Sequence, residues 1–127
     1  MPERGDIFEN LLLDLSTPMA YTMKFVETPI FTKELRGILS DDEYRSVQAA
    51  IMLRPEQGAI IRGTGGIRKL RWSGKGHGKS GGLRLIYYWD KKSETIYMLY
   101  VYAKSRQEDL TAEQCRLLGR LVREEFK

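Results

Sequence analysis

The spacing of apolar residues changes from helical to strand-like near Gly58. Residues 24–28 (KFVET) are expected to form a short strand. After them, apolar residues recur every three or four positions, as on one face of a helix. This stripe comprises Phe31, Leu35, Ile38, Tyr44, Val47 and Ile51. Two start signals divide it into a predicted αα-hairpin.

The first start signal is Thr28 followed by Pro29, an N-cap and a proline at the first helical position. This helix is expected to run through Leu39. The second signal is a capping box, Ser40 to Glu43, and its helix is expected to end near Pro55.

Beyond Gly58 three segments alternate apolar and polar positions, which is typical of strands. They are residues 67–72 (IRKLRW), 83–89 (LRLIYYW) and 95–103 (TIYMLYVYA). A turn at 90–93 joins the last two, and the three are expected to form an antiparallel meander. Thr111 and Gln114 then cap a final helix, whose apolar face is Cys115, Leu118, Leu121 and Val122. The predicted order is β-α-α-β-β-β-α, an α+β domain with helices packed on a small antiparallel sheet.

The chain's length of 127 residues fits a single domain. The compact domain is expected to span residues 23–127. Residues 1–22 are expected to be an extension, either flexible or docked as an accessory helix, or the product of an upstream translation start. Their acidic beginning does not resemble a secretory signal, and no window has the 18 or so apolar residues of a membrane span.

A single cysteine, Cys115, forms no internal disulfide, and we expect it to be a buried structural thiol in a cytoplasmic protein. With only one histidine and one cysteine, far apart in sequence, we expect no metal and no cofactor.

The net charge is only +4, but the positive charge is concentrated in one segment. Between Glu56 and Asp90 there are seven Lys or Arg residues, the only histidine, nine of the twelve glycines and no acidic residue. A basic, glycine-rich segment between strands is suited to binding phosphates, which makes nucleic acid the leading class of partner.

Several motifs in this segment and around it resemble the RelE/ParE superfamily of bacterial toxins, and more closely its HigB-type members. They are FVETPIF, LSDDEYRSVQ, GTGGIRKLRW, GGLRLIYYW and YAKSRQEDLT, which together extend from about residue 23 to residue 125. The resemblance implies a RelE/ParE-like fold and a ribosome-dependent mRNA endonuclease. Its implied partners are mRNA in the ribosomal A site, ribosomal RNA and a helix-turn-helix antitoxin encoded beside it, with no membrane.

Metal-free RNA cleavage uses the substrate's own 2′-hydroxyl as nucleophile, and a cluster of cations suits the charged transition state. The resemblance places catalytic residues at Lys69 and Arg71, two positions apart on one strand face, and at Arg84. We expect Arg84 to clamp the scissile phosphate, because its planar fork matches two phosphate oxygens. Lys69 is the candidate base or charge stabiliser, supported by Arg71. The alternative role for all three is to cover the sheet edge and meet acidic helix residues.

Further residues are candidates for contacting RNA or the ribosome: Arg68, Lys75, His77, Lys79, Tyr88, Lys104 and Arg106. Tyr88 shares the Arg84 face by alternation and is a candidate for base stacking, with packing against the core or a helix as the alternative. RelE itself has a catalytic tyrosine shortly after the last strand. This chain has SRQEDLT there, so that role does not transfer.

Two other functions remain open. A ParE-like protein would inhibit DNA gyrase without nuclease chemistry, although its relatives usually lack this dense basic array. A noncatalytic RNA-binding module would use the same cations for adhesion only.

Overall fold

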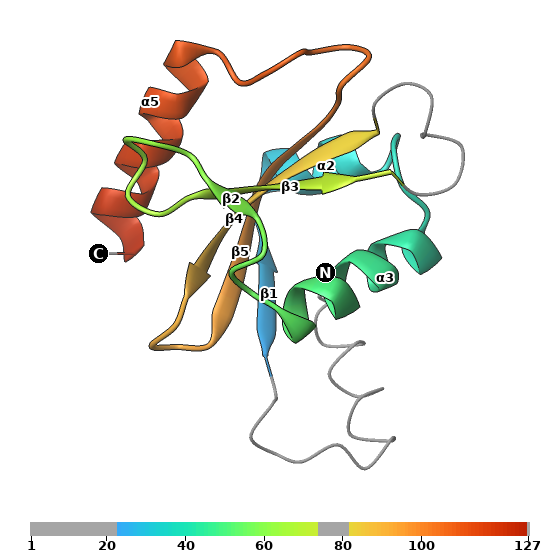
Figure 1. The fold of residues 1–127 in the computed structure, drawn as a ribbon, viewed down its shortest axis with the longest axis horizontal. Helices are drawn as coiled ribbons and strands as arrows, with labels where there is room; N and C mark the ends of the chain where they lie inside the picture. Colours follow the sequence, from blue (N-terminus) through green and yellow to red (C-terminus); the bar gives the residue numbers. More distant parts are fainter. Residues whose placement is uncertain (1–22, 74–81, 127) are drawn as a thin grey trace.

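A five-stranded sheet forms the middle of the molecule in the computed structural model, which describes residues 23–73 and 82–126 (Figure 1). Its strands are β1 (Lys24–Glu27), β2 (Ala59–Ile60), β3 (Arg68–Trp72), β4 (Leu83–Asp90) and β5 (Thr95–Ala103). The helices are α2 (Pro29–Leu35), α3 (Asp41–Leu53) and α5 (Ala112–Leu121), and a π-helical segment, η3 (Val122–Phe126), continues α5. The proposed extension 1–22 lies outside the described residues, so its boundary stays a prediction.

The predicted order of elements is confirmed, with one addition, the two-residue strand β2. The antiparallel meander is also confirmed, because β3 pairs with β4 and β4 with β5 in antiparallel fashion. The sheet as a whole is mixed and not wholly antiparallel, since β1 lies parallel to β5 at the edge of the order β1-β5-β4-β3-β2. No tight turn joins these two strands, so local sequence does not set their relative direction.

The predicted caps are present at all three helix starts. The side chains of Thr28 and Ser40 accept hydrogen bonds from the backbone N–H groups of Phe31 and Glu43, both at 3.1 Å. Thr111 and Gln114 form the reciprocal capping box of α5. Each bond satisfies a donor that the first helical turn leaves unpaired.

Helix α2 is four residues shorter than predicted. After Leu35 the backbone tightens, with bonds from Gly37 N–H to Glu34 O (3.3 Å) and from Ile38 N–H to Leu35 O (3.0 Å). These three-residue steps end the α-helical ladder. Leu39, where this helix was expected to end, is nevertheless buried in the core.

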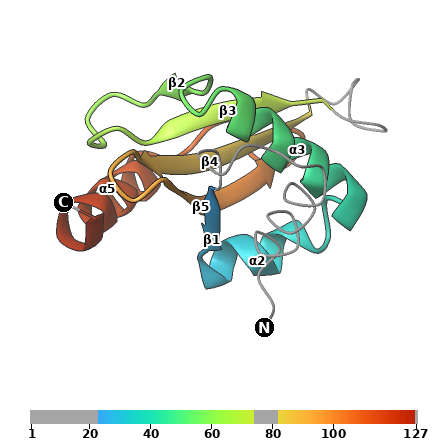
Figure 2. The ribbon, with the colours of Figure 1, turned by 90° about the horizontal axis from the view of Figure 1, so that it is seen from below.

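Two apolar layers lie on opposite faces of the sheet. In the ribbon, α2 and α3 lie together at one side of the view and α5 at the other (Figure 2). Side chains of α2 and α3, including Phe31, Leu35 and Val47, pack on one face against Leu70 and Leu85. On the other face Val122 is buried, and Leu118 and Leu121 are partly buried. Cys115 is half-buried, which corrects the expectation of a buried thiol, because it lines a small hollow together with Ile60 and Leu110.

Candidate nucleic-acid interface

The cations predicted on one face of β3 do lie there, and the strand register places them beside those of β4. Arg71 is the cross-strand partner of Arg84, and Arg84 is in turn the partner of Tyr102 on β5. Lys69 lies two positions before Arg71 and so on the same face. Directly opposite residues in an antiparallel pair have Cβ atoms about 5 Å apart. The sheet therefore gathers Lys69, Arg71 and Arg84 into one row, which we call the cation row.

Asp109, in the segment after β5, contacts the cation row. Its Oδ1 accepts hydrogen bonds from Lys69 Nζ at 3.1 Å and from the backbone N–H of Leu110 at 2.8 Å. The Leu110 N–H lowers the pKa of Asp109 most, followed by the bond from Lys69, and the charge of Lys104 adds to the effect. The carboxylate is therefore ionised at neutral pH, and Lys104 lies near enough to join this group.

Tyr102 lies within the electrostatic influence of both Asp109 and Arg84. Its side chain is buried, and this burial is the main reason why its pKa is raised to about 12. The negative charge of Asp109 raises the pKa further, and the positive charge of Arg84 opposes both effects. Tyr102 is thus a neutral phenol at any physiological pH, between a carboxylate and a guanidinium.

Arg84 is only 5% exposed. Its Nη1 donates to the carbonyl oxygen of Leu83 at 3.2 Å. A buried guanidinium keeps its charge only where neighbouring groups compensate for lost water. Arg84 therefore presents little surface to a ligand, and Arg71, its cross-strand partner, is the exposed cation next to it.

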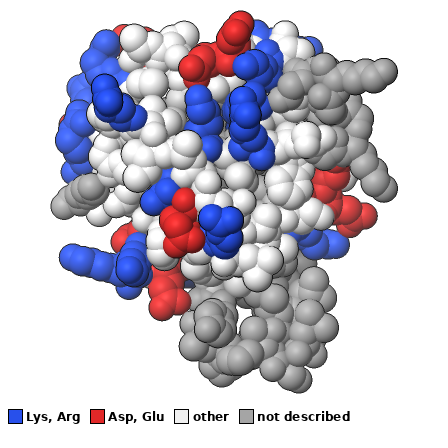
Figure 3. Space-filling view, in the orientation of Figure 1, with Lys and Arg blue, Asp and Glu red and all other residues white. Residues whose placement is uncertain are grey.

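In the space-filling view, basic and acidic side chains lie side by side at the top of the face shown (Figure 3). Lys69 Nζ and Asp109 Oδ1 form an ion pair, with the two atoms 3.1 Å apart. The Lys69 side chain keeps 30% of its exposure, and Arg71 is exposed. Both therefore remain accessible to a ligand.

Arg68 lies apart from the cation row. It lies on the opposite sheet face, and its Nη1 donates to the carbonyl oxygens of Glu56 (2.6 Å) and Gly58 (2.8 Å). Tyr87 holds the same loop, since its hydroxyl donates to Pro55 O at 2.6 Å and accepts from Gly58 N–H at 3.0 Å. Arg68, a candidate for contacting RNA, thus holds the segment before β2 through two backbone carbonyls.

Tyr88 packs against the end of the chain. Its ring stacks on Phe126 with centroids 5.6 Å apart and planes 10° apart, and the ring of Tyr97 also stacks on Phe126, with centroids 4.0 Å apart. This is the packing role that the sequence had left as the alternative to base stacking.

The remaining candidates lie either just after β5 or outside the described residues. Lys104 is half-buried near Asp109, and Arg106 is exposed beside a groove that Tyr100 and Tyr102 of β5 also line. Lys75, His77 and Lys79 lie outside the described residues. Asp109 is a member of the site that sequence reasoning missed, because one acid within SRQEDLT carries no signal that it would meet a lysine 40 positions earlier.

Across residues 23–73 and 82–126 no three His, Cys, Asp or Glu side chains gather in a way that could hold a metal ion. In the same ranges no helix has the length and apolar character needed to cross a membrane.

Known structures share this fold. The isolated E. coli RelE toxin superposes with a TM-score of 0.51 at 16% identity, covering 78% of this chain and 98% of that one. A mutant of E. coli RelE in the free state superposes with a TM-score of 0.52 at 17% identity, and the match covers 68% of this chain and 87% of that one. A chain of the intact E. coli RelBE toxin–antitoxin complex superposes with a TM-score of 0.50 at 17% identity, and the match covers 62% of this chain and 93% of that one.

The sequence itself matches a family over residues 23–125, described as the RelE toxin of the RelE/RelB toxin–antitoxin system. This span includes all three residues of the cation row and Asp109. The chain belongs to the RelE toxin family.

Proposed function

We propose that the protein is a ribosome-dependent endoribonuclease that cleaves translated mRNA by metal-independent attack of the 2′-hydroxyl. The observation that supports this most directly is the register of the sheet, in which Arg71 lies opposite Arg84 with Lys69 on the same face. Three cations in one row suit a phosphate whose transition state carries extra negative charge. The HigB-type likeness belongs to the same proposal.

In this mechanism Arg84 clamps the scissile phosphate, because its planar fork matches two phosphate oxygens. Lys69 acts as base or charge stabiliser with the support of Arg71. The phosphate would compete with Asp109 for Lys69, so RNA binding and the breaking of the Lys69–Asp109 pair are expected to occur together.

The proposed setting is the cytoplasm, where mRNA in the ribosomal A site and ribosomal RNA would contact the protein. A helix-turn-helix antitoxin encoded in the neighbouring reading frame would hold it inactive. The likeness to a RelE chain that was solved as a toxin–antitoxin complex supports a partner of this kind.

Induced expression in bacteria with mapping of transcript ends tests the activity. We expect growth arrest with cuts inside translated codons. Arg84→Ala should reduce the cutting rate by about a hundredfold or more, as loss of a transition-state donor does elsewhere. The control is Arg120→Ala on α5, where Arg120 Nε lies 3.5 Å from Glu124 Oε2. This variant should cut mRNA at the normal rate.

Because Arg84 is buried, its alanine variant must be shown to fold by circular dichroism. Arg71→Ala is a second variant at an exposed position and should also slow cutting. Growth arrest with intact mRNA and damaged DNA would indicate gyrase inhibition instead. RNA binding without any cuts would indicate a noncatalytic module.

A further inference from the structure

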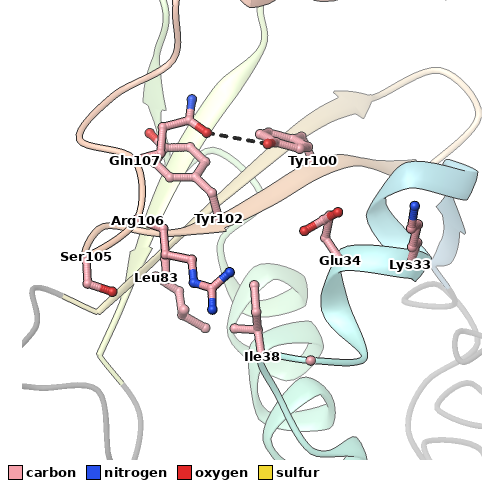
Figure 4. Close-up of a pocket in the computed structure, with 11 residues that line it drawn as sticks. Lys33, Glu34, Ile38, Leu83, Tyr100, Tyr102, Ser105, Arg106 and Gln107 are labelled. Atoms are coloured by element: carbon pink, nitrogen blue, oxygen red, sulfur yellow. Dashed lines mark hydrogen bonds between the residues drawn. The ribbon is translucent and has the colours of Figure 1, made fainter.

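A groove lies at the edge of the sheet, between α2 and the C-terminal half of β5 (Figure 4). It has a volume of about 560 Å³. Within the described residues β1 pairs with β5 only as far as Met98, so β1 does not cover this half of β5. The walls of the groove include Glu34 and Ile38 on one side and Tyr100, Tyr102 and Arg106 on the other.

Two tyrosine rings form one wall of the groove. The centroids of Tyr100 and Tyr102 are 5.9 Å apart, and their planes are inclined by 34°. The Tyr100 hydroxyl donates to Gln107 Oε1 at 3.4 Å, and Gln107 Nε2 donates in turn to Gln114 Oε1 at 2.6 Å. The wall is therefore held by a hydrogen-bonded chain that ends on α5. Tyr102 is buried, so the half-buried ring of Tyr100 is the aromatic face available for an unstacked RNA base to stack on.

The groove contains a charge of each sign. Figure 4 shows the Glu34 carboxylate and the Arg106 guanidinium both pointing into it. A guanidinium suits a phosphate. An ionised carboxylate only accepts hydrogen bonds, so it favours a base with an exocyclic amino group and disfavours one that presents a carbonyl there.

The groove adjoins the cation row through Tyr102. Tyr102 forms part of the groove wall, and it is also the cross-strand partner of Arg84. Neighbouring strands lie about 4.8 Å apart. A nucleotide whose phosphate is bound at Arg84 could thus place an adjacent base in the groove.

We propose that the groove binds one base of the RNA strand next to the phosphodiester held at Arg84, and that Glu34 selects bases with an exocyclic amino group. The placement next to the reacting phosphate rests on the proposed function. Base binding itself rests on the groove alone. The inference supplies a physical source for sequence preference in the cleaved RNA.

The test titrates the full-length protein with 5′-CMP and 5′-UMP and follows backbone amides by ¹H–¹⁵N NMR. These nucleotides differ at C4, where cytosine has an amino group and uracil a carbonyl. We expect both to shift the amides of Glu34, Gly37 and Arg106, with CMP binding about tenfold more tightly, the value of one good hydrogen bond to a charged group.

Glu34→Gln should remove the preference for CMP, because an amide both donates and accepts. Glu125→Gln on η3 is the matched control and should keep it. Arg106→Gln should weaken the binding of both nucleotides equally, since both carry the same phosphate. Equal affinities for CMP and UMP in the wild-type protein, or shifts confined to residues outside the groove, would overturn the inference.

The outcome is separable from that of the cleavage experiment. If CMP binds in the groove of a protein that cuts no RNA, the base site stands and the endonuclease proposal fails. If the protein cuts mRNA but neither nucleotide shifts the groove amides, the endonuclease proposal stands and the base site fails.

Discussion

At the scale of single residues, Asp109 determines how much positive charge the site presents. It accepts a hydrogen bond from Lys69 and partly neutralises the cation row in the unbound protein. Its side chain is 65% exposed, so the attraction is screened by water and the pair is expected to stabilise the fold by less than about 1 kcal/mol. The pair is therefore weak enough for an RNA phosphate to replace the carboxylate.

Lys69→Met should raise the pKa of Asp109 toward the ordinary value for an aspartate, as measured by ¹³C NMR titration of the carboxyl group. The rise should be incomplete, because the Leu110 N–H, which lowers the pKa most, remains. Lys104→Met is the control and should raise the pKa less, since Lys104 acts only through its charge. An unchanged pKa in the Lys69 variant would contradict the pairing.

The same pKa shift determines the sign of a pH effect on stability. The folded-state pKa of Asp109 is lowered, so the unfolded chain takes up its proton at higher pH than the folded one. The stabilisation is therefore fully present above the unfolded pKa and is lost as pH falls through the folded pKa.

At the scale of elements, the junction of β3 and β4 aligns the cation row. Gly82 precedes β4 and adopts a φ of +71°, in the left-handed region. A Cβ built there would lie 2.4 Å from the carbonyl oxygen of Trp72, at the end of β3. The backbones of the two strands thus approach too closely for any side chain at this position.

Gly82→Ala should lower the free energy of unfolding by about 2 kcal/mol or more, because it combines backbone strain with a backbone clash. Urea unfolding measures this. Gly37→Ala is the matched control, since its Cβ would meet nothing within 4 Å, and it should change stability by less than about 0.5 kcal/mol. Equal stability of the two variants would show that the junction tolerates a shift.

At the scale of the whole molecule, the placement of charge matters more than its amount. A net charge of +4 is too small for strong nonspecific attraction to RNA. The sheet and the segment after it nevertheless bring Lys69, Arg71, Arg84, Lys104 and Arg106 to neighbouring positions. This clustering raises the positive electrostatic potential at one place on the surface, and the affinity for phosphates there rises with it.

Affinity for a short single-stranded RNA should fall as KCl concentration rises, as fluorescence anisotropy can measure. Each phosphate contact on a single strand contributes about −0.7 to the slope of log affinity against log salt. Arg106→Ala should therefore reduce the magnitude of the slope by about 0.7. Arg116→Ala, on α5 and paired with Glu113, should leave the slope unchanged. Equal slopes for the wild type and the Arg106 variant would remove Arg106 from the phosphate-binding surface.

The sequence by itself determined the local features of this protein. Thr28, Ser40 and Thr111 cap helices as predicted, because a cap depends on residues three positions away. Alternation along β3 placed Lys69 and Arg71 on one face, because successive strand residues point to opposite sides. Both rules act within a few residues of the chain and need no knowledge of distant contacts.

The tertiary structure decided the rest, because those features depend on residues far apart in sequence. It made β1 parallel to β5, buried Arg84, and stacked Tyr88 on Phe126. It also joined Lys69 to Asp109, 40 residues later. A strand pattern shows which face a side chain occupies, but only the packing of other elements on that face decides whether the side chain meets solvent, an aromatic ring or an opposite charge.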